Sequence, residues 1–367
     1  MARRAGGVLS LAASLLFVFM GAVAAASPPG PRLAVVSLRD SEWTQLFTVD
    51  PQGGARHSVY AISAWKATRA VYPWSAPSWS PDGTRIVFTT LNESIPEFGR
   101  TGTSLASISA EGGAVNAIPG TTNGFEPVFS PDGRTIAFAR QREFYVPKRA
   151  GGDDDFESVS IWLADLQTGK SKPLTPWRDD VFLFPTSFSP DGSRLAISRV
   201  IAAKSLEAAE IGLDGKPIRV LARNAYEPIY SPDGRSIAFL RGPLKEVTRR
   251  FPPSGRLRLS ARLTDIFVRS ASGGGLRRLT HTERTAEEAP RWDPSGQRLA
   301  YTDWRPFDYG KKSAFVQESV GFGFGKTMRV INADGTCPTT ILSGLDSMHF
   351  AAVWQPGVGR EAGPISC

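Results

Sequence analysis

Five segments of the chain repeat one arrangement of apolar and polar positions. In each segment, an aromatic residue comes before a short turn that contains proline and glycine, and a run of apolar residues follows the turn. The segments are 77–90 (PSWSPDGTRIVFTT), 127–140 (PVFSPDGRTIAFAR), 186–199 (TSFSPDGSRLAISR), 228–241 (PIYSPDGRSIAFLR) and 290–303 (PRWDPSGQRLAYTD). Their starting positions are 42 to 62 residues apart, a period typical of four-stranded sheets arranged as blades around a ring.

The turn in each repeat joins two predicted strands. Proline fixes its own φ, aspartate accepts hydrogen bonds from the residues that follow it, and glycine adopts the positive φ that other residues avoid. Beyond the first turn, Ile86 and Phe88 face one side of the strand and Val87 faces the other, so this strand is buried on both faces. The predicted turn positions are Asp82, Gly83, Asp132, Gly133, Asp191, Gly192, Asp233, Gly234 and Gly296.

A second glycine-containing hairpin follows the repeat in several units, and it completes a blade of four strands, named A to D in chain order. It is visible at 161–175, 266–280 and 330–342. The two ends of the chain supply separate halves of one further blade. Segment 351–357 matches strand A, whereas 32–37 matches strand B and 46–59 matches strands C and D. The sequence therefore predicts an all-β, six-bladed β-propeller closed by its N- and C-terminal strands, which leaves no free sheet edge.

The first 26 residues have the pattern of a secretory signal peptide. Arg3 and Arg4 precede an apolar run that ends in alternating alanines, and prolines follow directly. We expect cleavage of 1–26, although an uncleaved anchor is the alternative because the run is nearly long enough to span a bilayer. The expected domains are a signal peptide (1–26) and one propeller (27–367), secreted or periplasmic, with no membrane span after cleavage. Cys337 and Cys367 are the two cysteines, and an exported chain favours their pairing as a disulfide.

The run of Pro-x-aromatic-Ser-Pro-Asp-Gly resembles the repeat of TolB-like propellers. The resemblance covers nearly all of the chain after the leader, with one departure at 293–296 (DPSG) in the fifth copy. It implies a six-bladed propeller in the bacterial envelope. It does not imply TolB itself, because TolB has an N-terminal domain ahead of its propeller and here the first predicted strand follows the leader almost directly.

The net charge of the chain is +8, of which Arg3 and Arg4 contribute two. A positive surface favours anionic partners or serves solubility. Export makes nucleic acid an unexpected partner, so a protein partner or an acidic glycan is predicted, with the propeller itself a monomer.

Alignment of the repeats places three arginines at one equivalent position, the end of strand B. These residues, Arg140, Arg199 and Arg241, are expected to form an arc. Glu126 and Glu227 occupy another equivalent position before strand A, near the mouth of the channel. Together with His349 they are the candidate ligand-binding residues. Salt bridges between these acids and arginines are the alternative interpretation, because paired charges commonly only hold loops.

The sequence contains no Gly-x-Ser-x-Gly nucleophile motif and only three histidines, none in a His-x-His pair. No catalytic residue, metal or cofactor is therefore predicted, and whether the protein is an enzyme stays open. We expect a non-catalytic binding or scaffold propeller that holds its partner on the face of the long loops between strands B and C. The alternative is a glycan lyase or hydrolase that uses Glu126, Glu227 or His349 as acid or base in the channel mouth.

Overall fold

The structure is a computed structural model of the 367-residue chain. It describes residues 31–39, 43–51, 54, 56–63, 71–72, 75–91, 102–142, 158–179, 181–201, 205–215, 218–251, 255–305, 326–343, 347–356 and 363–367. The expected signal peptide lies outside the described residues. In these ranges the secondary structure is strands and turns, and no helix is long and apolar enough to cross a membrane.

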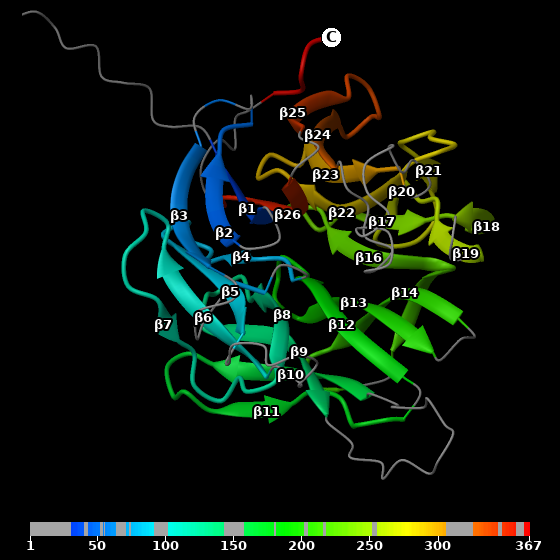
Figure 1. Ribbon diagram of the computed structural model, residues 1–367. Coiled ribbons are helices and arrows are strands. Elements are labelled where there is room, and N and C mark those ends of the chain that lie inside the picture. The colour runs from blue at the N-terminus through cyan, green and yellow to red at the C-terminus, as the bar shows by residue number, and fades with distance from the viewer. Residues whose placement is uncertain are drawn as a thin grey trace, which may run out of the picture.

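Antiparallel sheets are arranged around a central axis, along which Figure 1 looks. One sheet joins the two ends of the chain: β26 (Ser347–Trp354), β1 (Leu33–Arg39), β2 (Trp43–Val49) and β3 (Arg56–Ser63). The next contains β4 (Ser78–Trp79), β5 (Arg85–Leu91), β6 (Thr103–Ser109) and β7 (Asn116–Ala117). A third sheet contains β16 (Ala225–Tyr230), β17 (Ser236–Arg241), β20 (Asp265–Ser270) and β21 (Arg277–Arg278). A fourth contains β22 (Ala286–Trp292), β23 (Arg298–Trp304), β24 (Thr327–Asn332) and β25 (Thr339–Ser343).

The remaining strands of the ring form one eight-stranded sheet. They are β8 (Gly124–Phe129), β9 (Thr135–Arg142), β10 (Ser158–Asp165), β11 (Ser171–Pro173), β12 (Val181–Phe188), β13 (Arg194–Ile201), β14 (Ser205–Gly212) and β15 (Arg219–Arg223). Two antiparallel halves, β8–β11 and β12–β15, meet at a single parallel pairing of Val159 with Phe182. The all-β propeller is therefore confirmed. Four of the six expected sheets are separate, and the strands of the other two are joined in one eight-stranded sheet.

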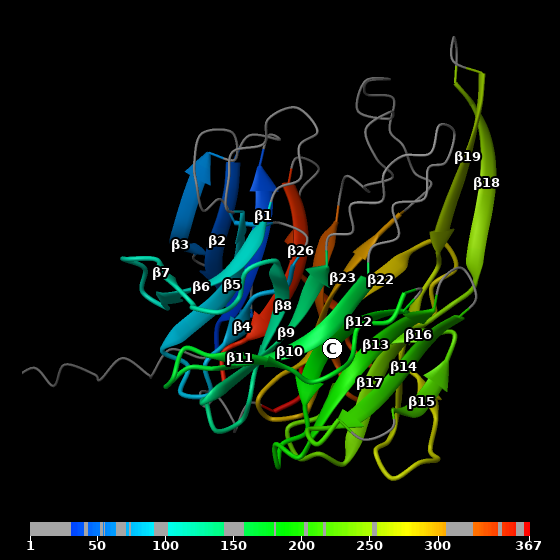
Figure 2. The ribbon, with the colours of Figure 1, turned by 90° about the horizontal axis from the view of Figure 1, so that it is seen from below.

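A further hairpin was not predicted as strands. It is formed by β18 (Leu244–Phe251) and β19 (Gly255–Arg262), within one of the long loops between strands B and C. Figure 2 shows the hairpin standing out from the rim of the ring. Its sequence has many arginines and weak alternation of apolar residues, so the hydrophobic pattern did not mark it.

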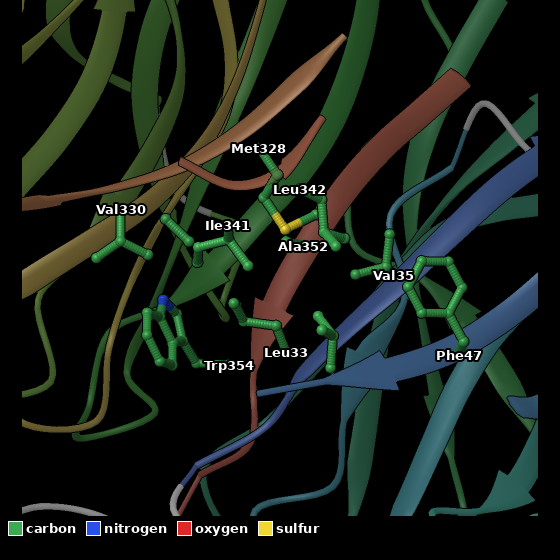
Figure 3. Packing of buried hydrophobic residues seen from close by; sticks show 11 residues of the cluster. Leu33, Val35, Phe47, Met328, Val330, Ile341, Leu342, Ala352 and Trp354 are labelled. Carbon is green, nitrogen blue, oxygen red and sulfur yellow. The ribbon is translucent and has the colours of Figure 1, made fainter. Parts of the chain in front are cut away.

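Hydrophobic clusters lie between neighbouring four-stranded units. Figure 3 shows the one that joins the terminal sheet to β22–β25, where Trp354, Leu33 and Val35 face Met328 and Val330. Every labelled residue of this cluster is less than a tenth exposed. Burial on both faces of the sheets explains the continuous apolar runs in strand B of each repeat.

The ends of the chain close the ring. Strand β1 pairs antiparallel with β26, with Leu33 opposite Trp354 and Arg39 opposite Ser347. The Gln355 side chain donates to the Gly83 carbonyl at 2.9 Å, which ties the closing sheet to the turn of the next one. The expected ring closure is thus present.

The predicted disulfide is also present. Cys337, in the turn between β24 and β25, is bonded to Cys367, and the two Cα atoms are 5.2 Å apart. Asn332 and Ile365 exchange two hydrogen bonds beside it, at 2.7 and 2.9 Å. The C-terminal tail is therefore fixed to the sheet next to the one that contains β26.

Candidate active site in the central channel

Strand A of each unit lines the central axis, and a β-bulge interrupts it at one repeated place. The register shifts between Phe125 and Val128 in β8, and between Tyr226 and Ile229 in β16. Within these bulges Glu126 and Glu227 have φ values of 52° and 50°. Such values are costly for residues other than glycine and accumulate at functional sites. A bulge also redirects a side chain, and here the redirected side chains are the two predicted glutamates.

Hydroxyl groups of the preceding unit hold each bulge in place. The Glu126 amide donates to Ser75 Oγ at 2.9 Å, and Ser75 is itself 2.7 Å from the Thr89 hydroxyl. The Glu227 amide donates to Ser198 Oγ at 2.8 Å. The backbone of both glutamates is therefore positioned from two blades at once.

Arg291 connects the two glutamates. Its Nη1 lies 3.9 Å from Glu227 Oε2 and donates to the Pro290 carbonyl at 2.8 Å. That Glu227 oxygen is buried and has no hydrogen-bond partner among the described residues. Arg291 and Glu126 both line one cavity of about 460 Å³, which follows strand A toward the prolines of the A–B turns. A ligand in this cavity would contact a guanidinium group and a carboxyl group together.

The low-dielectric surroundings change the acidity of both carboxyl groups. Burial raises the pKa of Glu126 to about 7; the Glu227 carboxylate adds to the rise and Arg291 opposes it. Burial also raises the pKa of Glu227, with Glu288 adding to the rise and Arg291 opposing it. Carboxyl groups whose pKa is raised by burial are typical of acid–base catalysis.

A second ion pair lies close to this group. Lys326 pairs with Glu288, and the indole nitrogen of Trp304 donates to Glu288 Oε1 at 2.6 Å. Lys326 is almost fully buried, with 6% of its surface exposed. Its charge also opposes the rise in the Glu227 pKa.

The three predicted arginines lie toward the ends of β9, β13 and β17, and each contacts its own surroundings. Arg140 donates to the Gly120 carbonyl and lies 3.9 Å above the centre of the Trp162 ring. Arg199 pairs with the buried Glu207 at 3.3 Å. Arg241 is exposed and lines a separate pocket. Strand B lies one strand away from the axis, so its ends face neighbouring strands and blades, and a shared ligand at the three arginines stays a prediction.

The other predicted ligand-binding residues are the two glutamates, which lie at the channel, and His349, which lies in the closing strand β26. Glu126 and Glu227 are close enough to affect each other's charge, and the arginine that acts on both is Arg291, which is not one of the three predicted arginines. The His349 backbone lies in β26 opposite Ser37, and its side chain is outside the described residues.

Repeat alignment could have identified Arg291. This residue occupies the position that the other units fill with Ser78, Val128, Ser187, Ile229 and Val353. A charged residue at a position otherwise apolar or small, on the strand nearest the axis, marks a departure from the structural pattern. Lys326 and Glu288 carry no such mark, because they lie outside the repeated motif.

Comparison with known proteins gives the fold a name. No family model matches the chain. TolB from Acinetobacter baumannii is similar in structure, with a TM-score of 0.58 at 18% identity over 89% of this chain and 67% of that chain. A putative TolB from Agrobacterium tumefaciens has a TM-score of 0.52 at 15% identity, covering 89% of this chain and 99% of that chain. The chain has a TolB-like β-propeller fold.

Among the curated proteins, the propeller is similar to "Uncharacterized peptidase YuxL" of Bacillus subtilis (strain 168). The two are 28% identical over 53% of this chain and 30% of that protein. The propeller therefore spans less than a third of the length of the relative that it matches.

This similarity contradicts the expectation of a non-catalytic scaffold, because the relative is described as a peptidase, which is an enzyme. The expectation rested on the lack of a contiguous catalytic motif. The channel carboxyl groups come from β8 and β16, which are about a hundred residues apart, and motif reading does not detect residues that only the ring brings together.

Proposed function

We propose that the protein is a glycan hydrolase whose reaction takes place in the central channel, with Glu126 and Glu227 as its acid–base pair. One observation carries the proposal: two carboxyl groups from different blades have raised pKa values beside one shared arginine. Most enzymes that hydrolyse glycosidic bonds use a pair of carboxyl groups that flank the bond.

In the proposed reaction Glu126 is the general acid. A group with a pKa of about 7 is about half protonated at neutral pH, which suits both donation and recovery of a proton. Glu126 donates its proton to the glycosidic oxygen as the bond to the anomeric carbon breaks. A water oxygen bonds to that carbon and releases its proton to Glu227. Arg291 holds an acidic group of the substrate or the carboxylate form of Glu227.

The test is an activity assay on neutral and acidic polysaccharides with Glu126→Gln and Glu227→Gln. We expect each substitution to lower kcat by about 100-fold or more, and the parent activity to decline above pH 7 as Glu126 loses its proton. Glu111→Gln is the matched control, because Glu111 is exposed and pairs with Arg32 away from the channel. Full activity in Glu126→Gln would refute the proposal. Products with an unsaturated end would assign the same carboxyl groups to a lyase.

A second candidate is peptide hydrolysis, which the similarity to the Bacillus peptidase favours. The same variants assayed on a peptide library distinguish the two substrate classes. Cleavage of peptides that depends on Glu126, with no glycan product, would move the assignment to a peptidase.

We further propose that the ring has six blades, with the eight-stranded sheet counted as two. The single parallel pairing between its halves and the separate hydrophobic cores on either side of β12–β15 support this count.

The disulfide supports an oxidising location, and we propose that the protein acts in the periplasm or outside the cell after removal of residues 1–26.

A further inference from the structure

A second pocket lies at the base of the β18–β19 hairpin, outside the channel. Its volume is about 480 Å³, and its lining includes three arginines, Arg241, Arg262 and Arg278, with Asp265, Phe267 and Asn224. None of its lining residues lines the channel cavity. A ligand in this pocket would therefore bind whether or not the channel has hydrolase activity.

The strand register places most of these residues on one face of a single sheet. Arg241 is opposite Asp265 across β17 and β20, and Phe267 is opposite Arg278 across β20 and β21. Directly paired residues in antiparallel strands share a face, as do residues two apart. The pocket is thus built on a continuous piece of regular sheet.

The single acid of the pocket is already neutralised. Asp265 Oδ2 accepts from Arg278 Nη2 at 2.5 Å, and Asp265 Oδ1 accepts from the Thr282 amide at 2.9 Å. Asp265 is 5% exposed. The pocket contains three guanidinium groups and one carboxylate, so its net charge is about +2, which favours binding of an anion.

Two of the arginines are held in place by the protein. Arg278 Nε donates to the Thr280 carbonyl at 3.0 Å, and Arg262 Nη1 donates to the Gly242 carbonyl at 3.2 Å. In the part of the chain that the structure describes, no ion pair or hydrogen bond engages the Arg241 guanidinium. Arg241 is therefore free to bind an anion with its two parallel N–H donors.

An aromatic ring forms part of the pocket wall. Phe267 is partly exposed, and its ring stacks on Phe239, with centroids 6.0 Å apart and an angle of 11° between the planes. Phe239 is fully buried, so Phe267 cannot move toward the core. The Phe267 ring is a fixed apolar surface beside the cationic groups, and Asn224 adds a polar side chain.

We infer that this pocket binds an acidic saccharide unit, whose oxyanion is held by Arg241 with Arg262 and Arg278 and whose ring lies against Phe267. A cavity of this volume accommodates a small ligand. The ligand class is a sugar with a carboxylate or phosphate group, since both oxyanions match the guanidinium geometry.

The test is calorimetric titration of the full propeller with trigalacturonate, neutral galactotriose, glucose 6-phosphate and inorganic phosphate. We expect at least one acidic sugar to bind more tightly than both galactotriose and inorganic phosphate, with affinity that decreases as salt is added. Trigalacturonate and glucose 6-phosphate distinguish a carboxylate from a phosphate ligand.

Arg241→Ala and Arg241→Glu are the test variants, and Arg235→Ala is the matched control, because Arg235 is exposed in the turn directly before β17, whereas Arg241 is the last residue of this strand. The Arg241 substitutions should weaken binding by about 10- to 100-fold, whereas Arg235→Ala should leave it unchanged. Three results would overturn the inference: no binding of either acidic sugar, equal binding of the neutral sugar or of phosphate alone, and unchanged affinity in both Arg241 variants.

Discussion

At the scale of single residues, burial of carboxyl groups is the main determinant of the chemistry in this propeller. Glu287, in β22, is fully buried; its Oε1 accepts from the Thr282 hydroxyl at 2.8 Å, and its Oε2 has no partner among the described residues. Burial raises its pKa to about 8, with the Asp265 and Asp303 carboxylates adding to the rise. The folded protein therefore holds a proton that the unfolded chain releases.

This proton predicts how stability depends on pH. Between pH 4.5 and about 8 the folded state binds more protons at Glu287 than the unfolded state, so the free energy of unfolding falls as pH rises through this window. Glu287→Gln removes this contribution, and we expect it to stabilise the protein by about 4–5 kcal/mol relative to the parent at pH 9, with little difference at pH 5. Urea denaturation at both pH values measures the change. Equal differences at pH 5 and pH 9 would contradict the prediction, and Glu111→Gln is the control.

The residues of the site were partly predictable from sequence. Glu126 and Glu227 were found because the repeats align. The alignment gives the position of each residue along its strand, but it does not predict the positive φ of either residue. Arg140, Arg199 and Arg241 were aligned equally well, yet their partners, such as Glu207 for Arg199, come from other strands. An alignment of repeats predicts position within a blade, whereas contacts between strands and blades depend on side chains that the repeats do not share.

At the scale of the element, the turn between strands A and B is a repeated hydrogen-bonding unit. In the third copy of the motif, Asp191 Oδ1 accepts from Ser189 Oγ at 2.6 Å and from the Ser193 amide at 3.0 Å. These bonds, led by that from Ser189, lower the pKa of Asp191 to about 2. The departure at 293–296 exchanges the two residue types: Asp293 stands where the others have serine, and Ser295 donates to it at 2.7 Å.

The exchange gives this turn a buried ion pair. Asp293 Oδ2 accepts from Arg298 Nε at 2.9 Å; both residues are buried, and Arg298 lies 5.2 Å above the centre of the Trp354 ring. We expect Asp293→Ser to destabilise the protein by about 3–5 kcal/mol, because it leaves a buried guanidinium unpaired. Asp293→Ser/Arg298→Thr should recover much of the loss, since Thr135 occupies the equivalent position in another repeat. Chemical denaturation of both variants measures the difference, and a loss below 1 kcal/mol in the single variant would contradict the prediction.

Tryptophans connect strand A of neighbouring sheets near the closure. Each donates its indole N–H to a backbone carbonyl of the adjacent unit. The bonds are Trp79 to Val353 at 2.8 Å, Trp354 to Arg291 at 3.1 Å, and Trp292 to Ile229 at 3.4 Å. The closing sheet is thus bonded on both sides, and the aromatic position of the repeat, read from sequence only as an apolar residue, also has a polar role.

At the scale of the whole molecule, the closed ring was the most predictable feature, and the joining of two units into one sheet was the least predictable. The half-repeats at the two ends required that β1 and β26 pair, because otherwise each would leave an open edge. The joining of β10 to β12 could not be foreseen, since it depends on the path of residues between two units and on no feature of the repeat. The hairpin β18–β19 was missed because its sequence alternates apolar and polar residues only weakly.

The disulfide should matter most for this closure. In Cys337→Ser/Cys367→Ser we expect the free energy of unfolding to fall by about 3–4 kcal/mol, because a loop of 30 residues is no longer constrained in the unfolded chain. The backbone amides of β1 and β26 should then exchange with solvent faster than those of β13, which lies away from the closure. The reduced parent protein is the control and should match the double variant. Unchanged exchange at β1 would show that the bridge does not support the closure.

The pairing of β1 with β26 determines when the ring can close during synthesis. Strand β1 is made long before β26, so a nascent chain has no closed ring until residues 347–354 have emerged. Until then, β1 presents an unpaired edge that can recruit other strands or be cut by proteases. A chain that stops before residue 347 therefore keeps this edge open.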